Sequence, residues 1–145
     1  METVTEILAT KGRHVVTVGP RATVLDAAIL MNDHKIGALV VTETGRVRGM
    51  FTERDVLRRV VGERRDPAAT VVEEVMTAEV AVCRTNTTLD EARGAMKNRR
   101  IRHLPVVNDD QELIGLISIG DLNAHQAHSH ELTIHLLHEY LYGRV

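Results

Sequence analysis

The chain alternates between two hydrophobic periods, and the order in which these periods occur predicts its elements. Short runs rich in β-branched residues, at 14–18 and 80–83, are typical of strands. After each run, apolar residues recur every three or four positions, which predicts an amphipathic helix. Two more strands are predicted at 36–42 and 47–51, and apolar residues within 56–61 predict a second helix. The order is strand, helix, strand, strand, helix.

This order occurs twice, because the chain contains an internal repeat. Three pairs of segments match: TVLDAAILM at 23–31 with TLDEARGAM at 88–96, IGALVV at 36–41 with IRHLPV at 101–106, and GMFTERDVL at 49–57 with GLISIGDLN at 115–123. TVTEIL at 3–8 also resembles TVVEEV at 70–75. A single unit of about 60 residues is marginal alone, so we expect the two copies to bury their open sheet faces together.

Capping and polar residues predict the boundaries of these units. Thr23 with Asp26, and Thr88 with Glu91, have the spacing of a capping box or its Asp variant, so each pair begins a helix. The polar, Pro-containing stretch at 62–69 is the predicted linker. We therefore predict three parts: a first repeat with an N-terminal helix at 1–66, a second repeat at 67–125, and an amphipathic helical tail at 126–145.

Composition narrows the class of protein. The chain has 145 residues, of which 43% are apolar, and no run of about 18 consecutive apolar residues that would span a membrane. Its single cysteine, Cys83, excludes a disulfide scaffold and indicates a reducing compartment; within an apolar strand we expect it to be a core residue. Residues 1–13 contain no apolar leader segment, so we expect a cytosolic protein. A net charge of −2 and an aromatic content of 2% argue against nucleic acid as a partner.

The last strand-to-helix turn of each copy carries a shared motif, GMFTERD at 49–55 and GLISIGD at 115–121. Together with the doubling, this motif resembles that of a tandem pair of cystathionine β-synthase (CBS) domains, often called a Bateman module. IRHLPVV at 101–107 is close to the family's usual central strand, whereas Val40 stands where Pro is common. The resemblance covers about residues 3–124.

The resemblance implies an α+β fold of two β-α-β-β-α repeats, packed with pseudo-twofold symmetry and here followed by a C-terminal helix. It also implies a frequent disc-shaped homodimer and regulatory binding of adenine nucleotides in the clefts between repeats. We expect no attached catalytic domain. The sequence shows no Ser/His/Asp or Cys/His spacing typical of a catalytic site, so we also expect no enzymatic activity and no required cofactor.

The two motifs can also be interpreted chemically. The hydroxyls of Thr52 and Ser118 each stand at the end of a strand, and Asp55 and Asp121 follow three residues later, about one helical turn on. A carboxylate can accept from both ribose hydroxyls, and a hydroxyl suits phosphate oxygens. The alternative is an N-cap followed by an acidic residue that the helix dipole favours.

The phosphates of a nucleotide require cations, and the two copies differ in this respect. Arg102 and His103 alternate on the central strand of the second copy, where the first copy has Gly37 and Ala38. The two clefts are therefore not equivalent. In the first cleft Arg54, beside Thr52, is the candidate phosphate-binding cation; alternatively, Arg54 is a solvated arginine with no role in binding. With the adenine contacts that the resemblance implies, the predicted nucleotide-binding residues are Thr17, Val18, Ile36, Gly37, Ala38, Thr52, Arg54, Asp55, Val82, Arg102, His103, Leu104, Pro105, Ser118 and Asp121.

Two further charged groups invite a function. Arg58, Arg59, Arg64 and Arg65, with the run at 98–100, form either a basic surface or a solvated helix face and linker, and the balanced charge favours the solvated face. The tail is rich in histidine, and if 128–142 is helical, one face carries a candidate metal-binding set, namely His128, Glu131, His135 and His138. The alternative is an amphipathic helix docked on the pair or on its dimer mate, or a pH-sensitive contact between protomers.

We therefore predict a stand-alone regulatory protein that binds AMP, ADP or ATP and couples occupancy to its conformation or to a partner protein. NAD and S-adenosylmethionine stay open as ligands, because the aspartates recognise only the ribose. The alternatives are a module that responds to divalent metal through its tail and a purely dimerising module with empty clefts.

Overall fold

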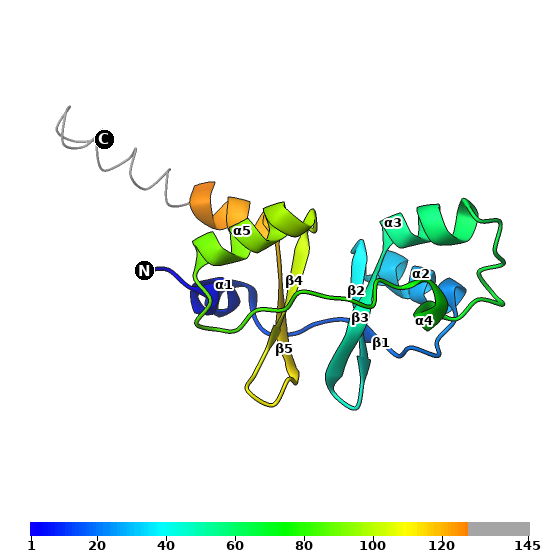
Figure 1. The fold of residues 1–145 in the computed structure, drawn as a ribbon, viewed down its shortest axis with the longest axis horizontal. Helices are drawn as coiled ribbons and strands as arrows, with labels where there is room; N and C mark the ends of the chain where they lie inside the picture. Colours follow the sequence, from blue (N-terminus) through cyan, green and yellow to red (C-terminus); the bar gives the residue numbers. More distant parts are fainter. Residues whose placement is uncertain (128–145) are drawn as a thin grey trace.

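The structure, a computed structural model, describes residues 1–127 as two repeats, each a small sheet with helices on its outer side (Figure 1). In the first repeat, β1 (Thr17–Val18) pairs in parallel with β2 (Ala38–Glu43), which pairs antiparallel with β3 (Arg46–Thr52). In the second, β4 (His103–Val107) pairs antiparallel with β5 (Leu113–Ser118). This confirms the predicted α+β fold, although the strand expected at 80–83 is reduced to one parallel bridge between Cys83 and Val106.

The first helix of each repeat begins at the predicted threonine. The backbone amide of Asp26 donates to Thr23 Oγ1 at 3.1 Å, and this cap begins α2 (Val24–His34). Thr88 and Glu91 form a complete capping box at the start of α5 (Leu89–Arg99). Both helices end in a left-handed residue, Lys35 or Arg100, so the two repeats terminate them in the same way.

The second helix of the first repeat departs from the α-helical expectation. It begins as a single turn, α3 (Glu53–Asp55), and continues as a π-helix, η1 (Val56–Val61). The amide of Gly62 donates to the carbonyl of Leu57 at 2.8 Å, five residues back. In the second repeat, residues 119–127 are helical.

The helix that precedes each repeat in the sequence packs against the other repeat. Val4, Ile7 and Leu8 of α1 (Val4–Lys11) are buried in the core of the second repeat. Val72 and Val75 of α4 (Val72–Val75) are buried in the core of the first. The N-terminal helix is therefore adjacent to the first repeat in the sequence but completes the core of the second, while the predicted division at residues 1–66 and 67–125 stays a prediction.

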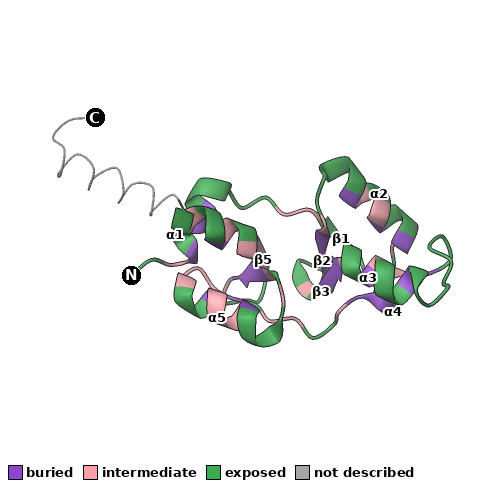
Figure 2. Cartoon of the chain, turned by 90° about the horizontal axis from the view of Figure 1, so that it is seen from above, coloured by how far each residue is buried: buried purple, intermediate pink, exposed green. Residues whose placement is uncertain are grey.

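A small core lies between the two repeats. The strand β2 is buried on both faces: its Leu39 and Val41 pack within the first repeat, whereas Ala38 and Val40 pack with Met50 toward the second. The partly buried residues of this shared core include Leu113 and Leu116 of β5. Buried positions accordingly follow the strands and one side of each helix (Figure 2). This shared core buries the sheet face that each repeat alone would leave exposed to solvent.

Two remaining predictions concern a membrane-spanning segment and the C-terminal tail. Among the helices of the described part of the chain, none combines the length and the apolar character needed to cross a bilayer. The tail from 128 onward, including the candidate metal ligands His128, Glu131, His135 and His138, lies outside the described residues.

Candidate functional site

A cleft of about 830 Å³ lies between the two repeats. Its first wall is the strand-to-helix turn of repeat one, including Thr52 and Asp55. Its second wall comes from repeat two, from the end of α5 to the start of β4 at 99–103 and from the turn at 118–120. The connection at 77–81 lines it as well. The cleft is therefore composite, and a ligand in it would contact both repeats and the segment that joins them.

Asp55 is buried at the rim of this cleft, with 7% of its surface exposed. Its Oδ2 accepts the backbone amide of Thr52 at 3.0 Å and the Thr52 hydroxyl at 3.3 Å, while its own amide donates to Thr52 Oγ1 at 3.3 Å. This is a capping box, the alternative interpretation of the motif. The two interpretations are compatible, because an ionised carboxylate has about four acceptor positions and the box leaves some of them for another donor.

Arg59 holds the other side of the same carboxylate. Its Nε lies 3.8 Å from Asp55 Oδ1, and its Nη1 donates to the carbonyls of Met76 at 2.9 Å and Val75 at 3.3 Å. Those carbonyls end α4, where the connection to the second repeat begins. Arg59 thus links the carboxylate of Asp55 to the backbone of that connection.

The second motif forms the same box with an additional cation. The amide of Ser118 donates to Asp121 Oδ2 at 2.9 Å, and the amide of Asp121 donates to Ser118 Oγ at 3.0 Å. Lys11 Nζ lies 2.6 Å from Asp121 Oδ2. Sequence reasoning did not identify Lys11, because it lies far from both motifs along the chain and reaches Asp121 only through the packing of α1 on the second repeat.

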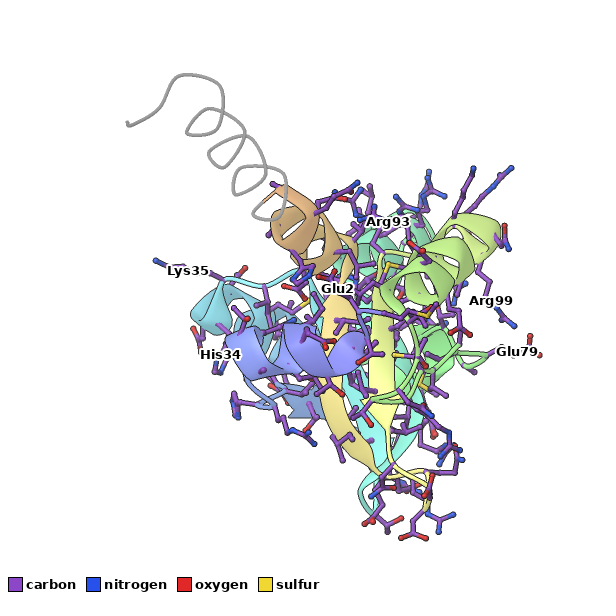
Figure 3. All side chains as sticks on the ribbon, turned by 90° about the vertical axis from the view of Figure 1, so that its left-hand side faces the viewer. Glu2, His34, Lys35, Glu79, Arg93 and Arg99 are labelled. Carbon is purple, nitrogen blue, oxygen red and sulfur yellow. The ribbon has the colours of Figure 1, made fainter. Side chains whose placement is uncertain are left out.

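Arginine dominates the charge of the cleft. Its cationic lining residues are Arg54, Arg58, Arg59, Arg99, Arg100 and Arg102, and its acidic lining residues are Glu53, Asp55 and Glu79. We expected Arg58, Arg59 and the run at 98–100 to form a solvated face. Arg58, Arg59, Arg99 and Arg100 are exposed, as expected, and the structure also places these four arginines around one cleft. The reason is tertiary, since the packing of the repeats brings the helix after β3 against the end of α5. Figure 3 shows Arg99 and Glu79 projecting on one side of the molecule.

The remaining arginines of that expectation lie elsewhere. Arg65 pairs with Glu74, and Arg64 is exposed in the linker. Neither lines the cleft, so only the part of the group that lies on η1 and α5 contributes to its positive charge.

His103 has a different environment from its neighbour Arg102, although both line the cleft. Burial lowers the pKa of the His103 imidazole, as do the charges of Lys11 and Arg102, while Asp121 raises it. The imidazole is therefore held neutral, so Arg102 is the cation of this pair.

The structure brings together about half of the predicted nucleotide-binding residues. Those that line the cleft are Gly37, Thr52, Arg54, Asp55, Arg102, His103 and Ser118. Those that do not line it are Thr17, Val18, Ile36, Ala38, Val82, Leu104, Pro105 and Asp121. Ala38 and Leu104 are buried, whereas Val82 lines a separate groove of about 260 Å³. The contributions of both groups to binding stay predictions.

The structure also bears on cysteine reactivity and on metal binding. Burial raises the pKa of the Cys83 thiol to about 12, as expected for a core cysteine rather than a nucleophile. Within residues 1–127, no cluster of three or more His, Cys, Asp or Glu side chains has the arrangement of a metal site.

Comparison with known proteins identifies the repeated unit. The family model "CBS domain" matches residues 4–62 and again 72–127. The CBS domain-containing protein YhcV of Bacillus subtilis is 40% identical over 112 residues, which cover 77% of this chain and 79% of YhcV. Two further curated relatives are longer, and the matched regions span 61% and 57% of their lengths.

Solved structures agree. A protein with CBS domains from Burkholderia ambifaria is 45% identical, with a TM-score of 0.78 over 83% of this chain and 90% of that one. The CBS domain protein PAE2072 from Pyrobaculum aerophilum, solved in complex with AMP, is 28% identical, with a TM-score of 0.73 over 82% of this chain and 88% of that one. The chain therefore belongs to the CBS domain family, and it carries two CBS repeats packed as a pair.

Proposed function

We propose that this CBS pair is a regulatory module that binds an adenine nucleotide in the cleft at Thr52 and Asp55. The observation that carries the proposal is the coincidence, on one cleft, of a buried carboxylate and six arginines. A carboxylate recognises the two hydroxyls of a ribose, and arginines recognise phosphate, so the cleft presents both halves of a nucleotide's polar chemistry. PAE2072, which has a similar fold and was solved with AMP, supports this class of ligand.

The geometry gives each residue a distinct role. One acceptor side of the Asp55 carboxylate is occupied by Thr52, and the other faces Arg59 at 3.8 Å, beyond direct hydrogen-bond distance. Ribose hydroxyls would take this second side. The arginines of α5 and of the α3–η1 helix would then hold the phosphates from both walls of the cleft.

The charge of the cleft favours a ligand with several phosphates. Six arginines face three acidic side chains, and Arg59 is already engaged with backbone carbonyls. Within residues 1–127, Arg54, Arg58, Arg99, Arg100 and Arg102 form no ion pair. A monophosphate cannot neutralise this set, whereas a triphosphate presents enough oxygen atoms to bridge both walls. We therefore expect ATP to bind more tightly than AMP.

Binding would be coupled to the relative position of the repeats. The cleft is lined by both repeats and by the connection at 77–81, and Arg59 ties Asp55 to the carbonyls that precede this connection. A ligand shifts only an equilibrium whose states bind it differently. A phosphate chain held by both walls meets that condition, because it stabilises an arrangement of the repeats in which both walls contact it. A partner protein or a second protomer can then recognise this arrangement. The module thus acts by regulation rather than by catalysis, and its cytosolic location stays a prediction.

The test is a binding panel on metal-free protein with AMP, ADP, ATP, NAD and S-adenosylmethionine, measured by thermal shift and by calorimetry. A ligand at 100 times its dissociation constant adds about 2.7 kcal/mol of stability, which corresponds to a shift of several degrees for a domain of this size. The expected result is a shift with adenine nucleotides, larger for ATP than for AMP. Asp55→Asn should remove it, because the amide oxygen stays on the side of the Thr52 amide, and the NH₂ left facing the cleft cannot accept from a ribose hydroxyl.

Asp121→Asn is the matched control, because it carries the same substitution at the same position of the other capping box. Loss of binding in both variants would point to a general effect of weakening a box rather than to a ribose site at Asp55. Absence of any nucleotide shift, together with a large shift on adding Zn²⁺, would replace the proposal by the metal-responsive alternative. A tight dimer that is indifferent to every ligand would indicate a purely dimerising module.

A further inference from the structure

The two repeats present equivalent aspartates in unequal charge environments. Asp121 Oδ2 accepts the ammonium of Lys11 at 2.6 Å as well as the amide of Ser118 at 2.9 Å. The corresponding carboxylate, Asp55, has its nearest cation, Arg59, at 3.8 Å. One aspartate is therefore in direct contact with an ammonium group and the other is not.

This difference arises from the length of the helix that completes each repeat. The helix α4 has four residues, after which the chain pairs with β3: Thr77 N donates to the Met50 carbonyl, and Met50 N donates to the Thr77 carbonyl, both at 2.9 Å. The helix α1 has eight residues and ends at Lys11. Its ammonium donates at 2.8 Å to the carbonyl of Leu116, which occupies in β5 the position of Met50 in β3.

A charged side chain thus replaces a backbone amide as the donor to the strand. A peptide N–H that bonds the Met50 carbonyl has no further donor to offer Asp55. An ammonium group has three donors, so after bonding the Leu116 carbonyl it can also reach the carboxylate of Asp121. In the second repeat, the Lys11 ammonium that bonds the strand therefore also bonds Asp121, the candidate ribose-binding carboxylate.

The position around Asp121 that corresponds to the Asp55 site, which we call the second position, has a counterpart of Arg100 as well. Lys35 ends α2 in the same left-handed conformation in which Arg100 ends α5, so these two cations correspond. His34 and Lys35 project on the side of the molecule opposite to Arg99 and Glu79 (Figure 3). Asp121 and Lys35 are thus the counterparts of Asp55 and Arg100, and the Lys11 contact distinguishes the carboxylate of Asp121 from that of Asp55.

We propose that Lys11 guards the second nucleotide position, so that a nucleotide occupies the Asp55 cleft first and reaches Asp121 only by displacing the Lys11 ammonium. This inference rests on the proposed function. Displacement removes both the ion pair and the donor to Leu116, and it releases the end of α1, which is otherwise packed on the second repeat. Occupancy of the second position would therefore be reported by the N-terminal helix.

The size of the barrier follows from the exposure of the pair. The side chains of Lys11 and Asp121 are 35% and 25% exposed, so solvent screens their attraction. An ion pair that solvent screens in this way changes an affinity by about fivefold. Lys11 is thus expected to bias the order of binding rather than to abolish the second event at every concentration.

The experiment is calorimetric titration of the full chain with ATP in four variants. The wild-type protein is expected to bind one ATP per chain in the first, tighter event, which Asp55→Asn removes and Asp121→Asn leaves unchanged. Lys11→Met removes the ammonium while keeping most of the aliphatic stem, and it should strengthen a second event about fivefold. Adding Asp121→Asn to Lys11→Met should remove that second event.

Two further variants separate charge from stability. Lys11→Gln keeps an N–H donor for the Leu116 carbonyl and removes the charge, so it should behave as Lys11→Met does even if the methionine variant is poorly folded. Lys97→Met removes one lysine charge from an exposed position of α5 and should titrate as the wild type does.

The inference is overturned if both Lys11 variants keep the wild-type titration, if the wild type already fills both positions with equal affinity, or if the Lys11 variants lose an Asp121-dependent event. The last result would make Lys11 a ligand of the phosphates. Another outcome would separate the two proposals. If the wild type binds no ATP and Lys11→Met shows one Asp121-dependent event, the role of Lys11 is supported and nucleotide binding in the Asp55 cleft is contradicted. If no variant binds ATP, both proposals fail.

Discussion

The charge environment of Asp55 and of Asp121 depends on neighbouring cations whose positions cannot be predicted from the sequence. Both close a capping box on the residue three positions earlier, as the shared motif predicts. Their cations come from unrelated parts of the chain: Arg59 from the following helix and Lys11 from the N-terminal helix. The local hydrogen bonds follow from spacing alone, whereas the electrostatics of each carboxylate follow from packing.

The glycines of the two motifs provide a test at the same scale. A Cβ at Gly49 would lie 2.6 Å from the Thr77 carbonyl oxygen and 2.7 Å from Met76 Sδ. This oxygen cannot move away, because it accepts the bridge from Met50. A Cβ at the corresponding Gly115 would lie 2.8 Å from Cδ2 of Leu8, the end of a flexible side chain.

We therefore expect Gly49→Ala to lower the free energy of unfolding by about 1–3 kcal/mol, with a smaller loss for Gly115→Ala. Urea denaturation followed by circular dichroism measures both. Equal losses would show that the bridge between Met50 and Thr77 yields as readily as a leucine side chain does.

At the scale of elements, the two repeats exchange helices. The helix α1 precedes the first repeat in the chain but packs on the second, and α4 precedes the second repeat but packs on the first. The start of α1 is anchored on the second repeat by three backbone hydrogen bonds. Val4 donates to the Thr87 carbonyl at 2.9 Å, Thr5 donates to the Thr85 carbonyl at 3.2 Å, and Leu89 donates to the Glu2 carbonyl at 3.1 Å. The apolar face of α1 then fills that core. The helix thereby delivers Lys11 to the end of β5, so its docking is a condition for the Lys11 contact.

Leu8→Ala tests this docking. Leu8 is 3% exposed in the core of the second repeat, and truncating a leucine at such a site costs about 2–5 kcal/mol. Chemical denaturation should show a loss in this range. Thr10→Ala, an exposed substitution on the same helix, is the control and should change little. A loss below about 1 kcal/mol for Leu8→Ala would mean that α1 contributes little to the second repeat.

The whole molecule depends on an exchange of segments as well as on the shared core. The two sheets meet through Val40 and Met50 on one side and Leu113 and Leu116 on the other. The exchanged helices bind each repeat to sequence that lies outside its own half of the chain. Separation of the repeats would thus expose the shared core and remove a helix from each.

Cutting the chain between residues 66 and 67 should therefore leave two halves that do not fold alone. The fragment 1–66 lacks α4, and the fragment 67–145 lacks α1, so each loses part of its core. Mixed in equal amounts, the halves should regain the circular dichroism spectrum and cooperative melting of the full chain. A cooperative thermal transition in either isolated half would contradict the exchange.

The sequence by itself determined the internal repeat, the order of the elements, the helix caps and the two motifs, because each of these depends on residues close together in the chain. Thr23 and Thr88 begin their helices, and Thr52 and Ser118 begin the helical turns after their strands, through hydrogen bonds that span three residues. Family resemblance then extended these local features to a fold and a class of ligand.

Only the tertiary structure decided which segments meet. It placed α1 on the second repeat, assembled arginines from η1 and α5 into one cleft, and set Lys11 against Asp121 but not Asp55. These contacts join residues far apart in the chain. Hydrophobic periodicity predicts which face of an element is buried, but not the element against which that face packs. Repeats that look equivalent along the sequence can therefore differ in charge, because the elements that complete them come from different places.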